Sequence, residues 1–332
     1  MVRYGAEGLP LRPLGRTGLE VTPLALGTWQ LGGEWGDFDQ REAVAAIRRA
    51  RDLGVNFFDT AQAYGFGASE RLLGEALRDD LRQRRDEIVI ATKGGLRMTY
   101  HGMVRDSSRE WLREGVEESL RALELEHIDL YQVHWPDPDV AFAETAGALQ
   151  ELVDEGKIRH VGVSNFDVEQ IDDFAGWRPV ETVQPPYHLF RRGIEADLLP
   201  YALERDIGVL VYGPLAHGLL TGALREDTEF APDDWRSKSE VFRGDSYRRN
   251  LDTVQELERF ARDRGHTVSQ VAIAWTLANP AVDVAIVGSR RAAHLDDSVG
   301  ALAVELGDED RAEIERIMAG TEAVAGPSPE SV

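Results

Sequence analysis

Eight short apolar runs alternate with longer amphipathic segments along most of this 332-residue chain. The runs are continuously apolar, which is typical of strands that are buried on both faces, as in a parallel sheet covered by helices. They lie at Leu24–Gly27, Val55–Asp59, Ile88–Thr92, Ile128–His134, Ile158–Ser164, Glu181–Gln184, Val209–Tyr212 and Val282–Val287. We therefore predict an α/β fold, a closed (β/α)8 TIM barrel, as a single domain over 1–332 with its core at about 11–318; an open doubly wound sheet is the alternative.

The segments between these runs have the apolar spacing of surface helices. They are Arg41–Leu53, Ser69–Leu77, Ser107–Leu123, Ala143–Glu155, Val168–Phe174, Ile194–Glu204, Tyr247–Arg264 and Asp308–Met318, with Ser269–Ala278 and Arg291–Ala301 flanking the eighth run. Ser107 is the predicted N-cap of its helix, because Glu110 follows three residues later. The stretch LGRTGLEV, before the first run, predicts an N-terminal β-hairpin at the bottom of the barrel. Residues 213–246 form one of the long strand-end loops, and loops of this length are usually functional or mobile.

The charge balance restricts the partners of this chain. A net charge of −22 and a sequence pI of about 4.8 argue against nucleic acid and against an anionic membrane surface, since both would be repelled. The chain has no cysteine, no long apolar span and no apolar leader at its start, so we expect a cytoplasmic protein without disulfides or thiolate metal sites. We expect a small-molecule substrate and no metal; both a monomer and a homo-oligomer are compatible with the sequence.

Four chemically useful side chains follow neighbouring strands. Asp59 ends the second run and Tyr64 follows in its loop; Lys93 follows the third run and His134 ends the fourth. In a barrel of this kind the carboxyl ends of the strands carry the chemistry, so these groups would converge on one small volume. Each residue alone has an ordinary explanation, as a turn residue, a rim aromatic, a solvated cation or a core imidazole. All four together favour an active site.

Such a group suits the protonation of a carbonyl oxygen while hydride arrives at its carbon. A free phenol has a pKa near 10 and is a weak acid at neutral pH. An ammonium at Lys93 stabilises the phenolate of Tyr64 and makes it a better proton donor. A buried lysine needs a counter-charge, which we assign to Asp59, and His134 would bind and orient the carbonyl.

Several stretches, in order from about Leu11 to Ala301, resemble the aldo-keto reductase superfamily. They are GTWQLGG from Gly27, FFDTAQAYGFGASERLLGEAL from Phe57, IVIATKGG from Ile88, EESLRALELEHIDLYQVHWPDP from Glu117, IRHVGVSNF from Ile158, VYGPLAHGLLTG from Val211 and VGSRRAAHLDDSVGA from Val287. The HWPDP segment makes the chain most similar to the bacterial members that resemble general-stress and inositol-utilisation proteins. The resemblance implies a (β/α)8 barrel, NADP(H) as cofactor, a catalytic tetrad of Asp59, Tyr64, Lys93 and His134, and Tyr64 as the proton donor.

The same resemblance implies how the cofactor is held. Ser164, Asn165 and Gln184 match the residues that bind the nicotinamide carboxamide, and Tyr212 matches the aromatic that stacks on its ring. The other implied cofactor contacts are Gly27, Thr28 and Trp29, then Gly213, Pro214, Leu215, His217 and Gly218 around the pyrophosphate, and Gly288, Ser289 and Arg290 at the 2′-phosphate.

The far end of the cofactor site departs from the family pattern. His294 and Ser298 stand where relatives often carry glutamine and asparagine; we expect His294 at the phosphate and Asp297 at the adenine amino group. For the substrate we expect aromatic walls from Trp29, Phe66 and Trp135, which suit an aldehyde or ketone with an apolar body.

Three functions remain open at this point. The favoured one is an NADPH-dependent carbonyl reductase. The second is a redox-sensing or regulatory protein that resembles the potassium-channel β-subunits, in which the tetrad would also be complete. The third is a metal-dependent isomerase or hydrolase, for which several histidine and carboxylate ligands at strand ends would be needed; only His134 is found there.

Overall fold

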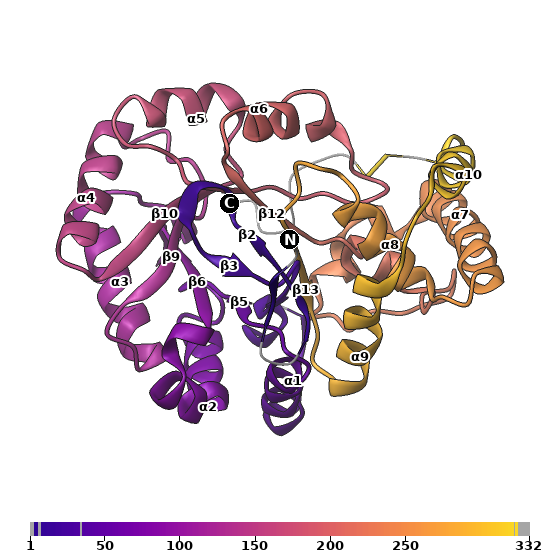
Figure 1. Ribbon diagram of the computed structural model, residues 1–332, viewed down its shortest axis with the longest axis horizontal. Helices are drawn as coiled ribbons and strands as arrows, with labels where there is room; N and C mark the ends of the chain where they lie inside the picture. Colours follow the sequence, from indigo (N-terminus) through magenta and orange to yellow (C-terminus); the bar gives the residue numbers. More distant parts are fainter. Residues whose placement is uncertain (1–2, 6–7, 34, 322, 325–332) are drawn as a thin grey trace.

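Eight parallel strands close into a barrel that is surrounded by helices (Figure 1). The computed structural model describes residues 3–5, 8–33, 35–321 and 323–324. The barrel strands, in their order around the barrel, are β4 (Leu24–Gly27), β5 (Phe57–Asp59), β6 (Val89–Gly94), β9 (Ile128–Val133), β10 (Ile158–Ser164), β11 (Thr182–Gln184), β12 (Gly208–Tyr212) and β13 (Val284–Gly288). Closure between β13 and β4 confirms the predicted TIM barrel over the open sheet. The single domain over 1–332 stays a prediction, because it includes residues outside the described ranges.

The interior of the barrel is filled by side chains from alternate positions of its strands. The cluster inside it consists of Leu14, Val21, Ala25, Phe57, Val89, Ala91, Leu130, Leu210, Tyr212, Val284 and Ile286. Successive strand residues point to opposite faces, so the other half of each strand packs outward against the helices in the larger apolar cluster. The strands are therefore mostly apolar on both faces, with polar exceptions such as Gln132 in β9 and Gln184 in β11.

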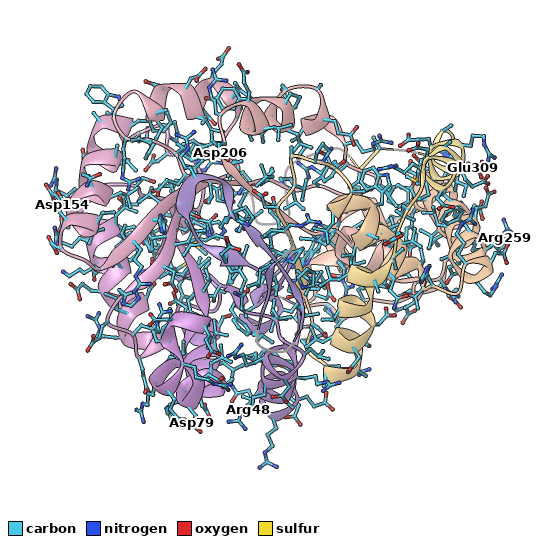
Figure 2. All side chains as sticks on the ribbon, viewed as in Figure 1. Arg48, Asp79, Asp154, Asp206, Arg259 and Glu309 are labelled. Atoms are coloured by element: carbon cyan, nitrogen blue, oxygen red, sulfur yellow. The ribbon has the colours of Figure 1, made fainter. Side chains whose placement is uncertain are left out.

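Ten helices lie in the described part of the chain. They are α1 (Gln40–Asp52), α2 (Ala68–Gln83), α3 (Arg109–Leu123), α4 (Phe142–Asp154), α5 (Val168–Ala175), α6 (Leu198–Glu204), α7 (Gly244–Asp263), α8 (Val268–Leu277), α9 (Ala292–Gly300) and α10 (Asp308–Met318). In Figure 1 most of them form a ring around the strands, with α7 and α10 together at one side as the extra helices. Their charged residues, such as Asp79, Asp154 and Arg259, project away from the barrel (Figure 2).

The observed helices differ from the predicted ones at several ends, and two of these differences have identifiable reasons. Ser108, not Ser107, is the N-cap of α3: its hydroxyl accepts from the amide of Trp111, while the Ser107 amide donates to Asp137 at 2.8 Å. The predicted helix over 194–204 is divided into a 3-10 turn (Gly193–Glu195) and α6. The Asp197 carboxylate accepts from the Leu198 amide as an N-cap, so a new helix begins at Leu198.

A small antiparallel sheet covers the bottom of the barrel, as predicted. It consists of β1 (Arg3–Tyr4), β2 (Pro10–Pro13) and β3 (Glu20–Val21), and Figure 1 shows β2 and β3 crossing the barrel opening. Leu14 is fully buried in the barrel interior. Gly15 has φ 44°, and a Cβ there would lie 2.2 Å from the Gly208 amide nitrogen, so the turn requires glycine.

The loop after Lys93 holds a second hairpin that the sequence reasoning did not predict. It pairs β7 (Leu96–Thr99) with β8 (Gly102–Arg105), antiparallel. Its strands are short and partly exposed, so they lack the continuous apolar run that marked the barrel strands. Tyr100 at its tip is 99% exposed.

One carboxyl group at the barrel bottom predicts a pH-dependent stability. Burial raises the pKa of Asp283 from its ordinary 3.8 to about 6. The hydrogen bond that the Val209 amide donates to it at 2.9 Å and the charge of Arg12 both lower this pKa, but by less than burial raises it. The folded protein thus holds this proton more tightly than the unfolded chain. The contribution of Asp283 to the free energy of unfolding is fully present below pH about 4. It is lost as the pH rises through about 6, which lowers the free energy of unfolding by up to about 3 kcal/mol.

Asp283→Asn should therefore match the wild type at low pH and exceed its free energy of unfolding at pH about 7, by up to about 3 kcal/mol. Urea unfolding across this pH range measures the difference. Asp79→Asn, on the exposed face of α2, controls for the loss of one negative charge from an acidic chain. A difference between Asp283→Asn and wild type that does not vary with pH would contradict the prediction.

Candidate active site

Asp59, Tyr64 and Lys93 meet in direct contact at the carboxyl ends of β5 and β6. The Lys93 Nζ lies 2.6 Å from Asp59 Oδ1, 2.9 Å from the Thr60 carbonyl oxygen and 3.3 Å from the Tyr64 hydroxyl. The Lys93 and Asp59 side chains are only 1% and 4% exposed. A buried ammonium is thus neutralised from one side by a carboxylate and faces a phenol on the other, which is the predicted arrangement.

His134 completes the group from the end of β9. Its ring lies 5.8 Å from the Tyr64 ring, edge to face, and it is 1% exposed. Its amide donates to the Gly94 carbonyl at 2.9 Å, which ties the end of β9 to the end of β6. All four predicted catalytic side chains therefore occupy one small volume.

The second oxygen of Asp59 is held by two amides. Gln184 Nε2 lies 2.9 Å and Gln132 Nε2 3.4 Å from Asp59 Oδ2, and Gln184 Nε2 also donates to Gln132 Oε1 at 3.3 Å. Both amide residues are buried inside the barrel end. Gln184 was predicted to contact the cofactor; Gln132 was missed, although a polar residue two positions before His134 in a buried strand was a usable signal.

Ser164, Asn165 and Tyr212 form a second polar group beside the first. Asn165 Nδ2 donates to the His134 carbonyl at 3.0 Å, and its Oδ1 accepts from the Tyr212 hydroxyl at 2.9 Å. Ser164 Oγ donates to the Gln184 carbonyl at 2.9 Å. Asn165 has φ 61°, a left-handed conformation that asparagine tolerates better than most residues. This network fixes the position of the Tyr212 ring at the cavity wall.

A cavity of about 460 Å³, called the main cavity because Asp59 and Tyr64 line it, opens from these groups. Most of the residues predicted to hold the cofactor line it, namely Gly27, Thr28, Trp29, Gln184, Tyr212, Gly213, Pro214, Leu215, His217, Gly218, Gly288, Ser289, Arg290 and His294, together with Asp59 and Tyr64. The cavity thus extends from the buried phenol to a cluster of basic residues at the ends of β13 and α9.

The loop after β12 forms one wall with an unusual backbone. Gly213, Ala216, His217 and Gly218 have positive φ angles of 68°, 47°, 55° and 102°. Left-handed residues among right-handed ones produce the concave backbone that binds anions in many proteins. The wall therefore has the backbone form of an anion-binding concavity.

The far end of the cavity carries both signs of charge. Arg290, Arg291 and His294 line it, and Arg290 Nη1 donates to the carbonyl oxygens of Trp35 and Asp37 at 3.4 and 3.2 Å. Asp37, Asp39 and Glu42 line it too and were not predicted. The basic residues supply the local positive charge that an anionic ligand needs on an acidic protein.

Six of the predicted cofactor and substrate residues do not line this cavity, and neither do the predicted catalytic residues Lys93 and His134. Ser164 and Asn165 contact the lining residues Gln184 and Tyr212, whereas the other four lie farther away. Asp297 accepts from the Thr267 hydroxyl, the N-cap of α8, at 3.0 Å, and Ser298 donates to the His294 carbonyl at 2.9 Å within α9. Phe66, 51% exposed, lines a separate cavity of about 490 Å³ between α2 and α3. Trp135 packs with a small apolar cluster that includes Leu96 under the β7–β8 hairpin. Of the predicted substrate residues, only Trp29 lines the main cavity.

Trp35 and Trp235, which form an aromatic group with the predicted residue Trp29 at the cavity wall, were also missed. Trp29 lies 5.0 Å from Trp35 and 6.0 Å from Trp235, measured between ring centres. Arg236 is paired with Asp234 at 2.7 Å, and its guanidinium lies 4.8 Å over the Trp35 ring. Trp35 and Trp235 come from loops that are 200 positions apart in the numbering, so only the folded chain brings them together.

The residues that the structure describes include no group of three or more histidine, cysteine or acidic side chains placed to hold a metal ion. Among the same residues, no helix is both long and apolar enough to span a membrane.

Comparison with known proteins gives concordant results. The family model described as "Aldo/keto reductase family" matches residues 23–319. The aldo-keto reductase YhdN of Bacillus subtilis is 41% identical over 307 residues, which cover 92% of each chain. The NADH-specific methylglyoxal reductase of Escherichia coli is 32% identical over 314 residues, covering 90% of this chain and 95% of the relative.

Solved structures agree with these relatives. The glycerol dehydrogenase of Gluconobacter oxydans superposes with a TM-score of 0.85 at 38% identity, over 97% of this chain and 98% of the other. An aldo/keto reductase of Klebsiella pneumoniae, in complex with NADP and acetate, superposes with a TM-score of 0.70 at 30% identity, over 92% and 94% of the two chains.

Proposed function

This chain belongs to the aldo/keto reductase family of oxidoreductases, and from that membership we propose that it reduces an aldehyde or ketone to an alcohol with NADPH. The observation that carries the proposal is the contact between the buried Lys93 ammonium and the Tyr64 hydroxyl, 3.3 Å apart, at the inner end of the main cavity. The reaction is reversible in principle, with the alcohol as substrate of the reverse direction.

Each residue of the tetrad has a distinct role in this proposal. Tyr64 donates its hydroxyl proton to the carbonyl oxygen of the substrate. Lys93 stabilises the phenolate that remains, and Asp59 keeps Lys93 charged although it is buried. His134, edge to face with the Tyr64 ring, orients the carbonyl for this proton transfer.

The cavity residues fit a nicotinamide dinucleotide. When bound, the reduced nicotinamide supplies the hydride. Gln184 offers its amide, with Ser164 and Asn165 beside it, to the carboxamide, and Tyr212 offers an aromatic wall. The left-handed backbone of 213–218 suits the pyrophosphate, and the basic residues at 288–294 suit a 2′-phosphate. The Klebsiella relative contains NADP, and the E. coli relative is NADH-specific, so the 2′-phosphate contact is the part that most needs a test.

The direct test is titration of the purified protein with NADPH and NADH, followed by a panel of aldehydes and ketones assayed by the absorbance of the reduced nicotinamide. We expect saturable NADPH binding and turnover with at least one apolar or ring-bearing carbonyl compound. Binding without turnover across a broad panel would instead favour the redox-sensing alternative.

Arg290→Ala should weaken NADPH binding about tenfold or more while changing NADH binding much less, because a guanidinium bound to a phosphate contributes about 1.5 to 3 kcal/mol. Arg290 also donates to the carbonyl oxygens of Trp35 and Asp37, so some loss for both cofactors is expected from loosening that loop. The ratio of the two dissociation constants is therefore the measurement. An equal loss for NADPH and NADH would contradict the assigned phosphate contact.

A further inference from the structure

The cavity of about 490 Å³ that Phe66 lines, called the second cavity, lies among the outer helices and not inside the barrel. Helices α2 and α3, which are neighbours in the ring of Figure 1, form two of its walls, and the turn after β5 and strand β7 form the others. None of its lining residues lines the main cavity. Its volume lies within the range of about 300 to 1,000 Å³ that is typical of small-molecule sites.

Apolar side chains form much of the wall of the second cavity. Phe66 and Met98 line it and remain 51% and 50% exposed, whereas most large apolar side chains in the described part of the chain are buried. Trp111 lines it too, and its Nε1 already donates to the Leu96 carbonyl at 3.0 Å, so the rest of the indole offers carbon atoms. Exposed apolar side chains that gather at one place mark binding sites more often than scattered ones do.

Two arginines of the second cavity have no counter-ion. Arg71 from α2 and Arg121 from α3 line it, and neither guanidinium forms an ion pair or a hydrogen bond with a described residue. The Arg71 guanidinium lies against the wall, since a Cβ added to Gly67 would lie 3.0 Å from its Nη1. On the same two helices, Arg78 and Arg113 are paired with glutamates at 2.8 and 2.6 Å. Arg71 and Arg121 therefore remain available to a carboxylate, which guanidinium groups bind well.

Two acidic residues also line the second cavity, but they do not balance the arginines. Glu118 is a carboxylate whose Oε2 accepts from Gln62 Nε2 at 2.7 Å. Glu70 is fully buried, and its Oε1 accepts from the Thr92 hydroxyl at 2.6 Å. Burial raises the pKa of Glu70 by more than Thr92 and Arg71 lower it, which favours its neutral form. Two cations then face one carboxylate, a balance that suits a ligand with one negative charge.

The second cavity also reaches the turn that carries Tyr64. Ala63 and Phe66, on either side of Tyr64 in the sequence, line it. The Gly67 amide donates to the Gln62 carbonyl at 2.8 Å and closes this turn. Phe66 has φ 51°, a left-handed conformation that is uncommon for a phenylalanine. An occupant of the second cavity would thus lie against the segment whose phenol contacts Lys93.

We propose that the second cavity is a binding site for a small amphipathic monocarboxylate. Its carboxylate lies between Arg71 and Arg121, and its apolar body lies against Phe66, Met98 and Trp111. Because the two cavities share no lining residue, this inference goes beyond the proposed function and does not depend on it.

The test compares three ligands with the same alkyl chain, namely octanoate, octanol and octylammonium, whose head groups are negative, neutral and positive. Binding of each to the full chain is measured by isothermal titration calorimetry. Octanoate should bind at least about fivefold more tightly than either of the others, because only its head group accepts hydrogen bonds from both guanidinium groups while carrying the opposite charge. Octanol or octylammonium binding as tightly as octanoate would overturn the proposal, and so would a failure of octanoate to bind at millimolar concentration.

Three substitutions locate the octanoate. Arg71→Gln and Arg121→Gln each remove one charge and keep a polar side chain. Each should weaken octanoate binding about threefold to fivefold and leave octanol binding unchanged, as expected for an ion pair at a partly open site. Ala122→Leu adds apolar volume to the α3 wall and should weaken octanoate and octanol alike. Octanoate affinity that is unchanged in all three variants would place the ligand elsewhere and overturn the proposal.

Arg78→Gln is the matched control, because Arg78 lies on the same helix as Arg71 but is already paired with Glu124 and does not line the second cavity. It changes the net charge by the same amount and should leave octanoate binding at the wild-type value. A fall in Arg78→Gln equal to that in Arg71→Gln would show a general effect of net charge, and the assigned contact would be wrong.

Discussion

Tyr64→Phe is expected to lose carbonyl reduction by about 10³-fold in kcat while binding NADPH with an affinity within about twofold of the wild type. The substitution removes only the hydroxyl that lies 3.3 Å from Lys93 Nζ. The phenyl ring keeps its place between Trp29 and His134, whose rings lie 6.5 and 5.8 Å from it. Proton donation is lost, and the cavity that binds the cofactor is conserved in shape.

One measurement and one control variant make this result specific. Cofactor binding is followed by quenching of tryptophan fluorescence, since Trp29 and Trp35 line the same cavity. Tyr212→Phe is the matched control: it also removes one hydroxyl from the cavity wall, the one that donates to Asn165, and should retain most of the turnover. Turnover retained in Tyr64→Phe would remove Tyr64 as the proton donor, and cofactor binding lost there would show that its role is structural.

The convergence of the four side chains could be predicted because a parallel barrel brings the carboxyl ends of neighbouring strands together. Asp59, Lys93 and His134 stand at the ends of adjacent strands, so recognising three strands was enough to bring the three side chains together. The contact between Lys93 and Tyr64 followed from this, because the turn after β5 is short and its direction is limited.

The cavity mouth could not be predicted in the same way. Trp35 and Trp235 meet because the long loop after β12 folds back over the loop after β4, and no periodicity in either loop encodes that contact. For Asp297 and Ser298 the helix could be predicted, but the contacts of the side chains could not. Their place in α9 was predicted correctly, but their hydrogen bonds to Thr267 and to the His294 carbonyl depend on neighbours that a linear motif does not reveal.

Lys93→Met should lose both activity and stability, for two separable reasons. The ammonium that stabilises the phenolate disappears, which we expect to cost about 10²- to 10³-fold in kcat. Asp59 is left as a buried carboxylate whose only described side-chain partners are the Gln184 and Gln132 amides. Removing one partner of a buried ion pair typically costs about 3–5 kcal/mol of folding free energy.

The double variant Asp59→Asn with Lys93→Met separates these effects. Removing both charges of a buried pair is often nearly neutral for stability, so most of the lost free energy of unfolding should return. Activity should not return, because nothing then stabilises the phenolate of Tyr64. Urea unfolding and carbonyl turnover, measured on the same preparations, give the two readouts. A double variant as unstable as Lys93→Met would show that the lost stability does not come from the unpaired Asp59 charge. Recovered turnover would show that proton donation by Tyr64 does not need a cation, and the electrostatic basis of the proposed mechanism would be wrong.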